Sequence, residues 1–372
     1  MRFLIITHVK HQVNNDEVSA YAPYVREMNL WLKHVNEVTI VAPQKNKKKG
    51  VIDLNYKHDN LIFKSIPSIE FTSIAKAFNS IIKIPLICYA IISACKNADH
   101  IHLRCPGNIG LLGCFVQIFF PSKVKTAKYA GNWDPASKQP ISYKIQKWLL
   151  SNTFLTKNMT AIVYGDWKNQ TKNIKSFFTA TFSNTEREVL NTRDYSNRLK
   201  VVFIGSLVEG KRPLFAIKII EALNKIGHDT TLDLYGDGDL KTSLFSYLKE
   251  NSLDSKIRLF GNQEKNVVKK ALKEAQFLIL PSKSEGWPKA IAEAMFFGAI
   301  PISTSVSCVP YLLDYGNRGI LIPNEFEKSI EIISKYLVNA EQLKTMSDEA
   351  VKWSQKYTLE FFEAEIIKLL KK

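Results

Sequence analysis

The sequence predicts an α/β protein of two domains, each built on a parallel sheet with helices on both faces. Three observations lead to this fold class. Short apolar segments alternate along the chain with longer helical ones, which is the pattern of strand–helix–strand units. The length of 372 residues suits two domains of ordinary size. A polar stretch without apolar periodicity, from Asn184 to Arg198, predicts the linker between them.

Residues 1–190 are expected to form an N-terminal Rossmann-like domain. An amphipathic segment from Tyr21 to Lys33 predicts an early helix, and further apolar helical stretches separate short runs typical of buried strands. The predicted strands are Arg2–His8, Val38–Ala42, Leu61–Ile66, His100–Arg104, Lys125–Tyr129, Ala161–Tyr164 and Thr179–Phe182.

Residues 198–352 repeat this alternation and predict a C-terminal Rossmann-like domain, followed by a last helix over Trp353–Leu370. The predicted strands are Val201–Ile204, Thr231–Tyr235, Lys256–Phe260, Phe277–Leu280, Ile300–Ser303 and Gly319–Ile322. Ligands of open parallel sheets bind beyond the carboxyl ends of the strands, so the loops after these strands are where a site is expected.

Charge is distributed unevenly between the two halves. Residues 1–180 carry 24 Lys and Arg against 10 Asp and Glu, whereas residues 181–372 carry 27 against 25. A basic domain attracts phosphate groups, which favours an anionic bilayer, a lipid diphosphate or nucleic acid as its partner. The segment Ser142–Thr156 mixes lysines with apolar residues such as Trp148. It predicts either a helix at a membrane interface or a helix packed on its own domain.

Cysteine usage and hydropathy predict a cytoplasmic protein, attached at most peripherally to the inner face of the cell membrane. The five cysteines follow no metal-ligand spacing, which is typical of reduced core thiols. The longest uncharged apolar runs, Ile84–Cys95 and Ile109–Ser122, are shorter than the roughly 20 residues that a spanning helix needs. Met1-Arg2 leads directly into a strand, so no signal peptide is expected.

The segment Pro281–Met295 is the most informative part of the chain, because it places Glu285 and Glu293 on either side of Pro288. Glu285 lies on the loop that leaves the strand Phe277–Leu280, and Pro288 suits the first position of the next helix. Free N–H groups and the helix dipole attract anions there. Glu293 lies roughly 7 Å further along the helix axis. A diphosphate at the helix start would have one carboxylate near each end, which suits a nucleotide sugar.

Two glutamates at this spacing also occur by chance on surface helices. Glu293, however, has apolar residues on both sides, Ala290–Ala292 and Ala294–Phe297. Burying a carboxylate there is costly without hydrogen-bond donors, and the hydroxyls of a ribose would supply them.

This region resembles the signature of the family-four retaining glycosyltransferases (glycosyl transferases group 1). Their GT-B fold has two Rossmann-like domains that face each other across a cleft. The matching residues are Glu285-Gly286-Trp287-Pro288 and Glu293-Ala294-Met295, followed by Gly298 and Pro301. Three segments earlier in the chain resemble further family motifs in the right order: Gly205–Lys211, Leu234–Gly238 and Ile257–Gly261. The resemblance is much weaker in the N-terminal half.

The resemblance implies a donor site on the C-terminal domain. It assigns the sugar hydroxyls to Glu285 and the backbone amides of Gly286–Lys289, the ribose to Glu293, and the leaving diphosphate to Lys211. The other residues expected at the donor are Gly205, Ser206, Arg212, Gly236, Trp287, Pro288, Lys289 and Ala290. The resemblance also implies that the final helix, residues 353–372, packs back on the N-terminal domain.

The donor motifs depart from the family at Ser206, where an arginine is usual, and Arg212 or Lys289 is expected to replace that charge. Asp237-Gly238-Asp239 resembles the metal-binding Asp-x-Asp of GT-A enzymes, but Gly-Asp-Gly after a strand is a common tight turn. The resemblance implies no metal and no cofactor, because lysine and the helix dipole take the charge of the leaving group.

On the acceptor side, family members often carry His-x-His at the end of an N-terminal strand. If Asp99 and Pro106 anchor the comparison, Arg104 stands in place of the second histidine. Arg104 is then expected to hold a phosphate or a sugar hydroxyl. His102 is either close to the transferred sugar or simply a strand-end histidine.

Two other segments are expected to shape the acceptor pocket. The loop after the first strand, residues 8–16, lacks the glycine pair of the family and contributes His11. Asn132 and Trp133 follow a strand, and an amide and an aromatic face are suited to bind the hydroxyls of a sugar and to stack on it.

The sequence therefore predicts a retaining, metal-independent glycosyltransferase of the hexosyl type. It would move a sugar from a nucleotide-sugar donor to a glycan or a lipid-diphosphate-linked oligosaccharide, in the synthesis of a surface polysaccharide such as lipopolysaccharide or capsule. Retaining transfer in this family needs no enzymic base, since the departing phosphate oxygen takes the acceptor proton. Ser206 and Arg104 are also consistent with a non-catalytic nucleotide-sugar binder. A nucleic-acid-binding protein would explain the positive charge, but it would give the glutamate pair no purpose.

Overall fold

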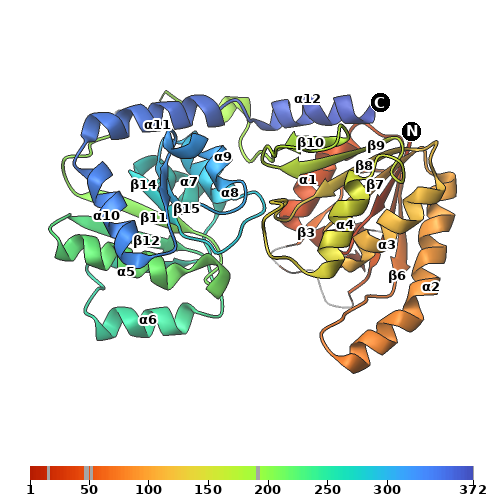
Figure 1. Cartoon of the computed structure of the whole chain (residues 1–372), viewed down its shortest axis with the longest axis horizontal. Coiled ribbons are helices and arrows are strands. Elements are labelled where there is room, and N and C mark those ends of the chain that lie inside the picture. The colour runs from red at the N-terminus through yellow and green to blue at the C-terminus, as the bar shows by residue number, and fades with distance from the viewer. Residues whose placement is uncertain (15–16, 46–49, 51–52, 190–192, 372) are drawn as a thin grey trace. The chain divides into compact units, whose positions relative to one another are not determined.

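In the computed structural model, the chain divides into two compact units, Met1–Phe178 with Phe362–Lys372, and Thr179–Phe361 (Figure 1). The structure describes all residues except 15–16, 46–49, 51–52, 190–192 and 372. The division falls after Phe178, earlier than the boundary at residues 190–198 that the sequence suggests.

The first unit is built on a parallel sheet in the strand order β10-β9-β8-β7-β1-β4-β6. Its strands are β1 (Arg2–Ile6), β4 (Glu37–Pro43), β6 (Leu61–Ile66), β7 (His100–Cys105), β8 (Val124–Tyr129), β9 (Met159–Tyr164) and β10 (Ile174–Phe177).

The predicted strand Thr179–Phe182 is wrong, because the edge strand β10 lies just before it and pairs Ile174 with Ala161 of β9. Residues 179–182 belong instead to the second unit, where Phe182 packs against Phe296 and Phe297 at ring distances of 4.9 and 4.7 Å. Alternating Thr and apolar residues are compatible with a strand of the first sheet or with an extended segment of the second unit, and the packing of Phe182 favours the second.

Helices cover the sheet of the first unit on both faces. On one face, α2, α3 and α4 lie next to one another, as Figure 1 shows, and α3 contacts both of the others. On the other face, Trp31 of α1 stacks on Phe3 of β1 at 5.9 Å. The helices are α1 (Ala22–Leu32), α2 (Ile74–Asn97), α3 (Asn108–Val116), the 3₁₀ turn η1 (Gln117–Phe119) and α4 (Ile141–Ser151).

A small antiparallel sheet follows β1, where the sequence suggested a loop. It consists of β2 (Gln12–Asn14), β3 (Glu17–Tyr21) and β5 (Asp53–Asn55). Strands of three residues carry too little alternation to be recognised, and β2 and β3 depend on pairing with each other.

The single C-terminal helix predicted over Trp353–Leu370 is instead two helices, α11 (Ala340–Ser354) and α12 (Leu359–Leu370). Between them, the Thr358 hydroxyl accepts a hydrogen bond from the Phe361 N–H at 3.4 Å, as a residue at a helix start does. Residues from Phe362 onward belong to the first unit, where Glu363 lies 2.8 Å from both Lys33 and His34.

The second unit is also built on a parallel sheet, in the order β13-β12-β11-β14-β15-β16, and each strand predicted there corresponds to an observed one. The strands are β11 (Leu199–Ile204), β12 (Thr230–Tyr235), β13 (Ile257–Gly261), β14 (Phe277–Leu280), β15 (Ile300–Thr304) and β16 (Ile320–Ile322). The helices before α11 are α5 (Pro213–Lys225), α6 (Lys241–Glu250), α7 (Lys265–Glu274), α8 (Lys289–Phe296), α9 (Val309–Leu312) and α10 (Phe326–Leu337). Short 3₁₀ turns are η2 (Asn184–Glu186), η3 (Glu209–Lys211) and η4 (Asp314–Gly316).

The predicted linker, residues 184–198, packs on the second unit wherever it is described. Glu186 lies 3.2 Å from Lys269, and Glu188 lies 2.6 Å from Lys273, both lysines being on α7. Arg193 donates to the Ala275 carbonyl at 2.8 Å. Polar composition alone does not distinguish a solvated linker from a segment that pairs with a basic helix. The ion pairs with α7 show that the described part of residues 184–198 is such a paired segment.

Glu27 anchors a buried ion cluster in the first unit. Its carboxylate lies 2.9 Å from Arg104 of β7 and 2.8 Å from Lys128 of β8. The three side chains are 6%, 13% and 1% exposed, respectively. Removing one partner of a buried ion pair leaves an uncompensated charge, so α1 depends on this cluster for its place against the sheet.

We therefore expect Glu27→Gln to destabilise the first unit by about 3–5 kcal/mol, because two buried cations lose their counter-charge. Urea unfolding, followed by hydrogen exchange in the first unit, measures the change. The matched control is Asp99→Asn, which removes the exposed pair with Arg2 and should cost about 1 kcal/mol or less. Equal effects of the two substitutions would contradict the role given to Glu27.

Candidate functional site

The strand orders single out one place in each sheet. In the second unit, the connections leave β11 toward β12 and β13, and then return to β14 on the other side of β11. In the first unit, β1 has the same position between β4 and β7. Open parallel sheets bind ligands beyond the carboxyl ends of the strands at such switch points. The candidate sites are therefore the loops after β11 and β14, and the loops after β1 and β7.

At the switch point of the second unit, Lys211 and Glu285 meet. The Nζ atom of Lys211, in the turn η3 after β11, lies 2.6 Å from Oε1 of Glu285, on the loop after β14. The Glu285 side chain is 5% exposed, whereas that of Lys211 is 30% exposed. A buried carboxylate needs such a partner. The lysine keeps access to solvent, and with it the ability to contact a second anion.

The loop of Glu285 is fixed through its carbonyl groups by side chains that follow β15. Ser307 Oγ donates to the Glu285 carbonyl at 2.6 Å, and Cys308 Sγ donates to the Gly286 carbonyl at 2.9 Å. A trans peptide points its N–H opposite to its C=O, so the N–H groups of Gly286 and Trp287 point away from these side chains. The sequence reasoning missed this support, and only the pairing of β14 with β15 reveals it.

The helix α8 begins at Lys289, and Pro288 is its cap residue rather than its first helical residue as predicted. The first turn of a helix has N–H groups without intrahelical acceptors. In α8, the N–H groups of Ile291 and Ala292 donate to the Pro288 carbonyl at 3.0 and 3.3 Å, so the amides just before them are the ones suited to an anion.

Two glycine loops complete the carboxyl edge of the sheet beside Lys211. The Gly205 N–H donates to the Tyr235 carbonyl at 3.0 Å, and the Leu207 N–H donates to the Asp237 carbonyl at 2.9 Å. Gly236 has φ +143°, and a Cβ there would lie 1.9 Å from the Gly205 carbonyl oxygen. Only glycine lets the loops after β11 and β12 approach so closely, and Ser206 stays exposed beside them.

Arg212 and Lys289 are the two residues expected to replace the positive charge of the family arginine at position 206, and they differ in their surroundings. Arg212 stacks on Phe215 at 3.8 Å and donates to Asn324 Oδ1 at 2.9 Å, so its guanidinium is held away from Glu285. Lys289 lines the pocket that contains Glu293, where burial raises the pKa of Glu293 and the charge of Lys289 opposes part of that rise. Lys289 is therefore the better placed of the two.

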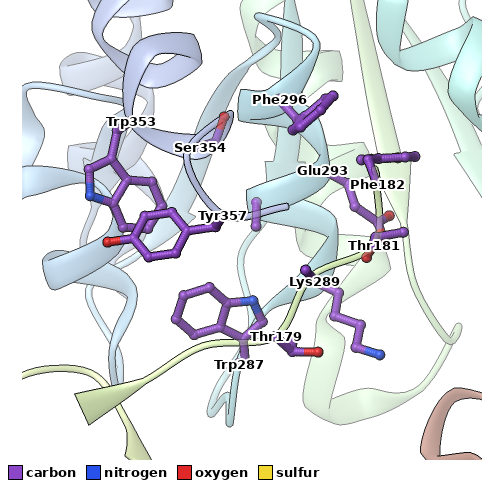
Figure 2. Close-up of a pocket in the computed structure, with 12 residues that line it drawn as sticks. Thr179, Thr181, Phe182, Trp287, Lys289, Glu293, Phe296, Trp353, Ser354 and Tyr357 are labelled. Carbon is purple, nitrogen blue, oxygen red and sulfur yellow. Dashed lines mark hydrogen bonds between the residues drawn. The ribbon is translucent and has the colours of Figure 1, made fainter. Parts of the chain in front are cut away.

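Figure 2 shows the pocket around Glu293. Glu293 Oε1 accepts a hydrogen bond from Thr181 Oγ1 at 2.8 Å, so the chain itself supplies a donor that the sequence argument assigned only to a ribose. Burial raises the pKa of Glu293, and Thr181 and nearby lysines oppose that rise. Trp353 and Tyr357 form an aromatic wall with ring centroids 4.4 Å apart. Glu285 does not line this pocket, and the two glutamates have different surroundings.

At the switch point of the first unit lies a second pocket, with about 620 Å³ of empty space including open solvent. Lys10 lies 3.7 Å from Glu70 at its edge. A Cβ on Gly107 would come within 2.6 Å of His8 Nδ1, so glycine is needed there. Burial and the charge of Arg104 lower the pKa of His8. The sequence analysis expected the loop of residues 8–16 at the acceptor pocket but named only His11 in it, since only the strand order brings the loops after β1 and β7 together. The lining residues are His8, Lys10, Pro43, Ser68, Ile69, Glu70, Pro106, Gly107, Asn108, Ile109 and Tyr143.

The histidines predicted on the acceptor side do not line this pocket, which is a correction to the sequence analysis. His11 is fully buried, stacks on Tyr56 at 5.6 Å, and hydrogen-bonds its hydroxyl at 2.8 Å. His102 is fully buried and hydrogen-bonds Thr126 Oγ1 at 2.8 Å. Polar residues near strand ends look functional in a sequence, but here aromatic neighbours enclose both rings.

The other predicted acceptor residues are also structural. Trp133 is 2% exposed and donates to Gln170 Oε1 at 3.0 Å, so it offers no free face to a sugar. The Asn132 side chain accepts from the Asp134 N–H at 2.9 Å. Arg104, which was expected to hold a phosphate or a sugar hydroxyl, is bound to Glu27 as described above. The helix α4, left open between two roles, packs on its own unit through Leu149 and Leu150.

Within the described residues, no group of three or more His, Cys, Asp or Glu side chains is placed to hold a metal ion. Asp237, in the motif that resembles Asp-x-Asp, lies 2.7 Å from Lys241 and accepts from the Gly238 N–H. The arrangement around it is that of a turn.

Comparisons with known proteins find relatives of this chain in sequence and in fold. The family model of glycosyl transferases group 1 matches residues 184–353. A glycosyltransferase of Methanocaldococcus jannaschii is 30% identical over 200 residues, which are 52% of this chain and 53% of the relative. A relative from Campylobacter jejuni is 27% identical over 173 residues, which are 46% of this chain and 47% of the relative. Its name is GalNAc-alpha-(1->4)-GalNAc-alpha-(1->3)-diNAcBac-PP-undecaprenol alpha-1,4-N-acetyl-D-galactosaminyltransferase. The chain thus spans about half the length of these two relatives.

Among solved structures, Anabaena HepE in complex with UDP and glucose matches with a TM-score of 0.68 and 13% identity. The match covers 100% of this chain and 99% of that chain. It shows that the two units have the fold of that protein, and the predicted GT-B fold class is confirmed.

We expect Gly236→Ala to destabilise the second unit by about 2–4 kcal/mol and to remove ligand binding at the switch point, because the methyl group forces the two glycine loops apart. Thermal unfolding and ligand titration measure both effects. Gly210→Ala is the matched control, since a Cβ there meets nothing within 4 Å. A Gly236→Ala protein as stable as the control would show that the close approach does not matter.

The buried histidines predict acid sensitivity in the first unit. Burial lowers the pKa of His11 and of His100 to about 4, and that of His102 well below its usual value. Below pH 6.5 the unfolded chain therefore binds more protons than the folded one, and the free energy of unfolding falls as the pH drops toward 4. The loss is on the order of 3 kcal/mol at pH 4 for each of His11 and His100, His102 adds to it in the same direction, and the effect disappears above about pH 7.5.

Hydrogen exchange as a function of pH checks this expectation, with the intrinsic pH dependence of exchange removed. Segments of β1 and β7 should lose protection between pH 6.5 and 4, while β11 and β14 in the other unit serve as the internal reference. A loss confined to the second unit would contradict the expectation.

Proposed function

We propose that this chain, whose residues 184–353 belong to the glycosyl transferases group 1, transfers a sugar from a nucleotide-sugar donor to a glycan or lipid-linked acceptor. The observation that carries the proposal is the contact between Lys211 and Glu285 at the switch point of the unit that the family model matches. The UDP and glucose in the complex of Anabaena HepE support a donor of this chemical class.

The donor binds at the carboxyl edge of the second sheet. Its diphosphate accepts hydrogen bonds from the N–H groups at the start of α8, and Lys211 neutralises its charge. Glu285, held by Lys211 and by the carbonyl contacts of its loop, accepts from the hydroxyls of the sugar. Glu293, already bound to Thr181, holds the ribose on its other side.

Lys211 and the α8 helix start stabilise the charge that develops on the leaving diphosphate, and no metal ion is needed for that step. Lys289 supplies the second positive charge in place of the family arginine that Ser206 replaces. We further propose that transfer retains the configuration at the anomeric carbon. The leaving phosphate oxygen then takes the proton of the acceptor hydroxyl, so that the buried His102 is not required as a base.

The acceptor binds to the first unit, in the pocket between the loops after β1 and β7. His8 and Lys10 offer it hydrogen bonds and positive charge, and Glu70 and Tyr143 offer partners for sugar hydroxyls. The excess of lysine and arginine in residues 1–180 favours a diphosphate-linked glycan. The Campylobacter jejuni relative is named for such an acceptor, a glycan on PP-undecaprenol, and we propose a comparable role in the synthesis of a surface polysaccharide.

The first experiment identifies the donor. Thermal unfolding is measured with UDP-, GDP-, ADP- and CMP-sugars, and a true donor at a hundredfold excess over its dissociation constant should stabilise the protein by about 2.7 kcal/mol. If no nucleotide sugar raises the melting temperature, the donor assignment is wrong.

The second experiment separates catalysis from binding. With that donor, Glu285→Gln should lower kcat/KM at least 100-fold, about 2.7 kcal/mol of transition-state stabilisation, and change the donor Kd less than tenfold. Glu209→Gln is the matched control, because Glu209 forms a 2.6 Å ion pair with Lys283 on the neighbouring loops. Unchanged turnover in Glu285→Gln would overturn the assignment. Donor binding without turnover in the parent protein would favour the non-catalytic binder.

A further inference from the structure

The helix α2 has two apolar faces, and only one of them is covered. Ile87, Ile91 and Ala94 are buried in the core of the first unit. The opposite face is exposed, although it too is apolar. At 100° per residue its members fall within a sector of about 140°. They are Ile74 (92% exposed), Phe78 (68%), Ile81 (56%), Ile82 (64%), Leu86 (59%) and Tyr89 (72%).

By length and composition, α2 is also able to cross a membrane, and 28% of its most apolar 18-residue window is buried within the structure. The sequence analysis expected no such segment, because it counted uncharged runs and Lys83 interrupts this one. A helix that is apolar all round is normally enclosed by protein or by lipid. The inner face of α2 is already part of the core, so the helix cannot leave the sheet without exposing Ile87 and Ile91.

The charge around this face is positive. Residues 71–165, which include α2, α3 and α4, contain 11 Lys and Arg against 2 Asp and Glu. Of these cations, Lys125 and Lys128 are buried, Arg104 pairs with Glu27, and Lys76 pairs with Glu70 at 3.1 Å, so the charge that faces solvent comes from the remaining lysines. Lys76, Lys83 and Lys96 belong to α2, which has no acidic residue. The neighbouring segments also carry exposed apolar side chains, Phe119 (76% exposed) after α3 and Trp148 (59%) on α4.

We propose that the exposed face of α2 docks the first unit on an anionic bilayer. The helix lies in the plane of the interface, with its exposed isoleucines and Phe78 among the acyl chains. Lys96, which points in the same sector as these side chains, reaches the phosphate groups. A second copy of this chain is a poorer occupant, because it would place lysines against lysines. This surface is distinct from the switch-point sites, so the inference stands or falls independently of the proposed transfer reaction.

Co-sedimentation with lipid vesicles tests the proposal on the full chain. Vesicles of phosphatidylcholine with about one third phosphatidylglycerol supply the anionic surface, and pure phosphatidylcholine is the reference. We expect at least tenfold stronger partition onto the anionic vesicles. The double variant Phe78→Ser/Ile82→Ser should lose at least tenfold of that partition, while its circular dichroism and melting temperature stay those of the parent.

The matched control is Ile226→Ser/Phe245→Ser, which removes two side chains of similar exposure (57% and 55%) from the second unit. Its partition should remain within twofold of that of the parent. Three results would overturn the proposal. The first is equal partition of the two double variants onto anionic vesicles. The second is vesicle binding that alkaline carbonate does not remove, as expected of a helix that spans the bilayer. The third is a parent protein that binds no vesicles but forms a dimer in sedimentation velocity, which Phe78→Ser/Ile82→Ser dissociates.

Discussion

The ion pair between Lys211 and Glu285 is the interaction on which the proposed donor site depends. It joins the loops after β11 and β14, which the reversal of strand order places side by side. Burial of the carboxylate is tolerable only because the lysine compensates it, and the partial exposure of the lysine leaves its charge available to a ligand. One contact thus orients the acid that is proposed to hold the sugar and the cation that is proposed to hold the phosphate. In a ligand-free protein, this pairing also keeps both side chains in defined positions.

The residues around Lys211 and Glu285 fix the two loops that carry this ion pair. Ser307 and Cys308 bind consecutive carbonyl groups of the Glu285 loop, and Gly236 lets the loop after β12 support the loop after β11. The first unit uses the same principle with different residues, since Gly107 allows the loop after β7 to meet His8 on the loop after β1. The charge of Arg104, by contrast, is satisfied inside that unit by Glu27. Charged residues of the first unit therefore divide into a buried set that holds the fold and an exposed set that faces solvent.

The sequence predicted the parallel sheets well, because short apolar strands are local signals. The structure brings Lys211 and Glu285 together, while the donor roles of Lys211, Glu285 and Glu293 stay predictions. The sequence failed where the outcome depends on contacts between distant segments. His11, His102 and Trp133 look like ligand-binding residues, but packing against Tyr56, Thr126 and Tyr129 turns them into core residues. Residues 184–198 look like a linker until α7 provides their partners. The sequence did not predict the exposed face of α2 for a related reason. An apolar helix is expected to be buried, and only the structure shows which of its faces is covered.

The most direct measurement of the central claim is hydrogen–deuterium exchange of the free protein against the protein saturated with its nucleotide sugar. The account predicts slowed exchange at the backbone amides of residues 205–211 and 286–291, with little change in β13 and β16 at the sheet edges. Bound phosphate at the start of α8 and at Lys211 is the physical reason. Protection confined to other segments, with the amides after β11 and β14 exchanging at the rates of the free protein, would contradict it.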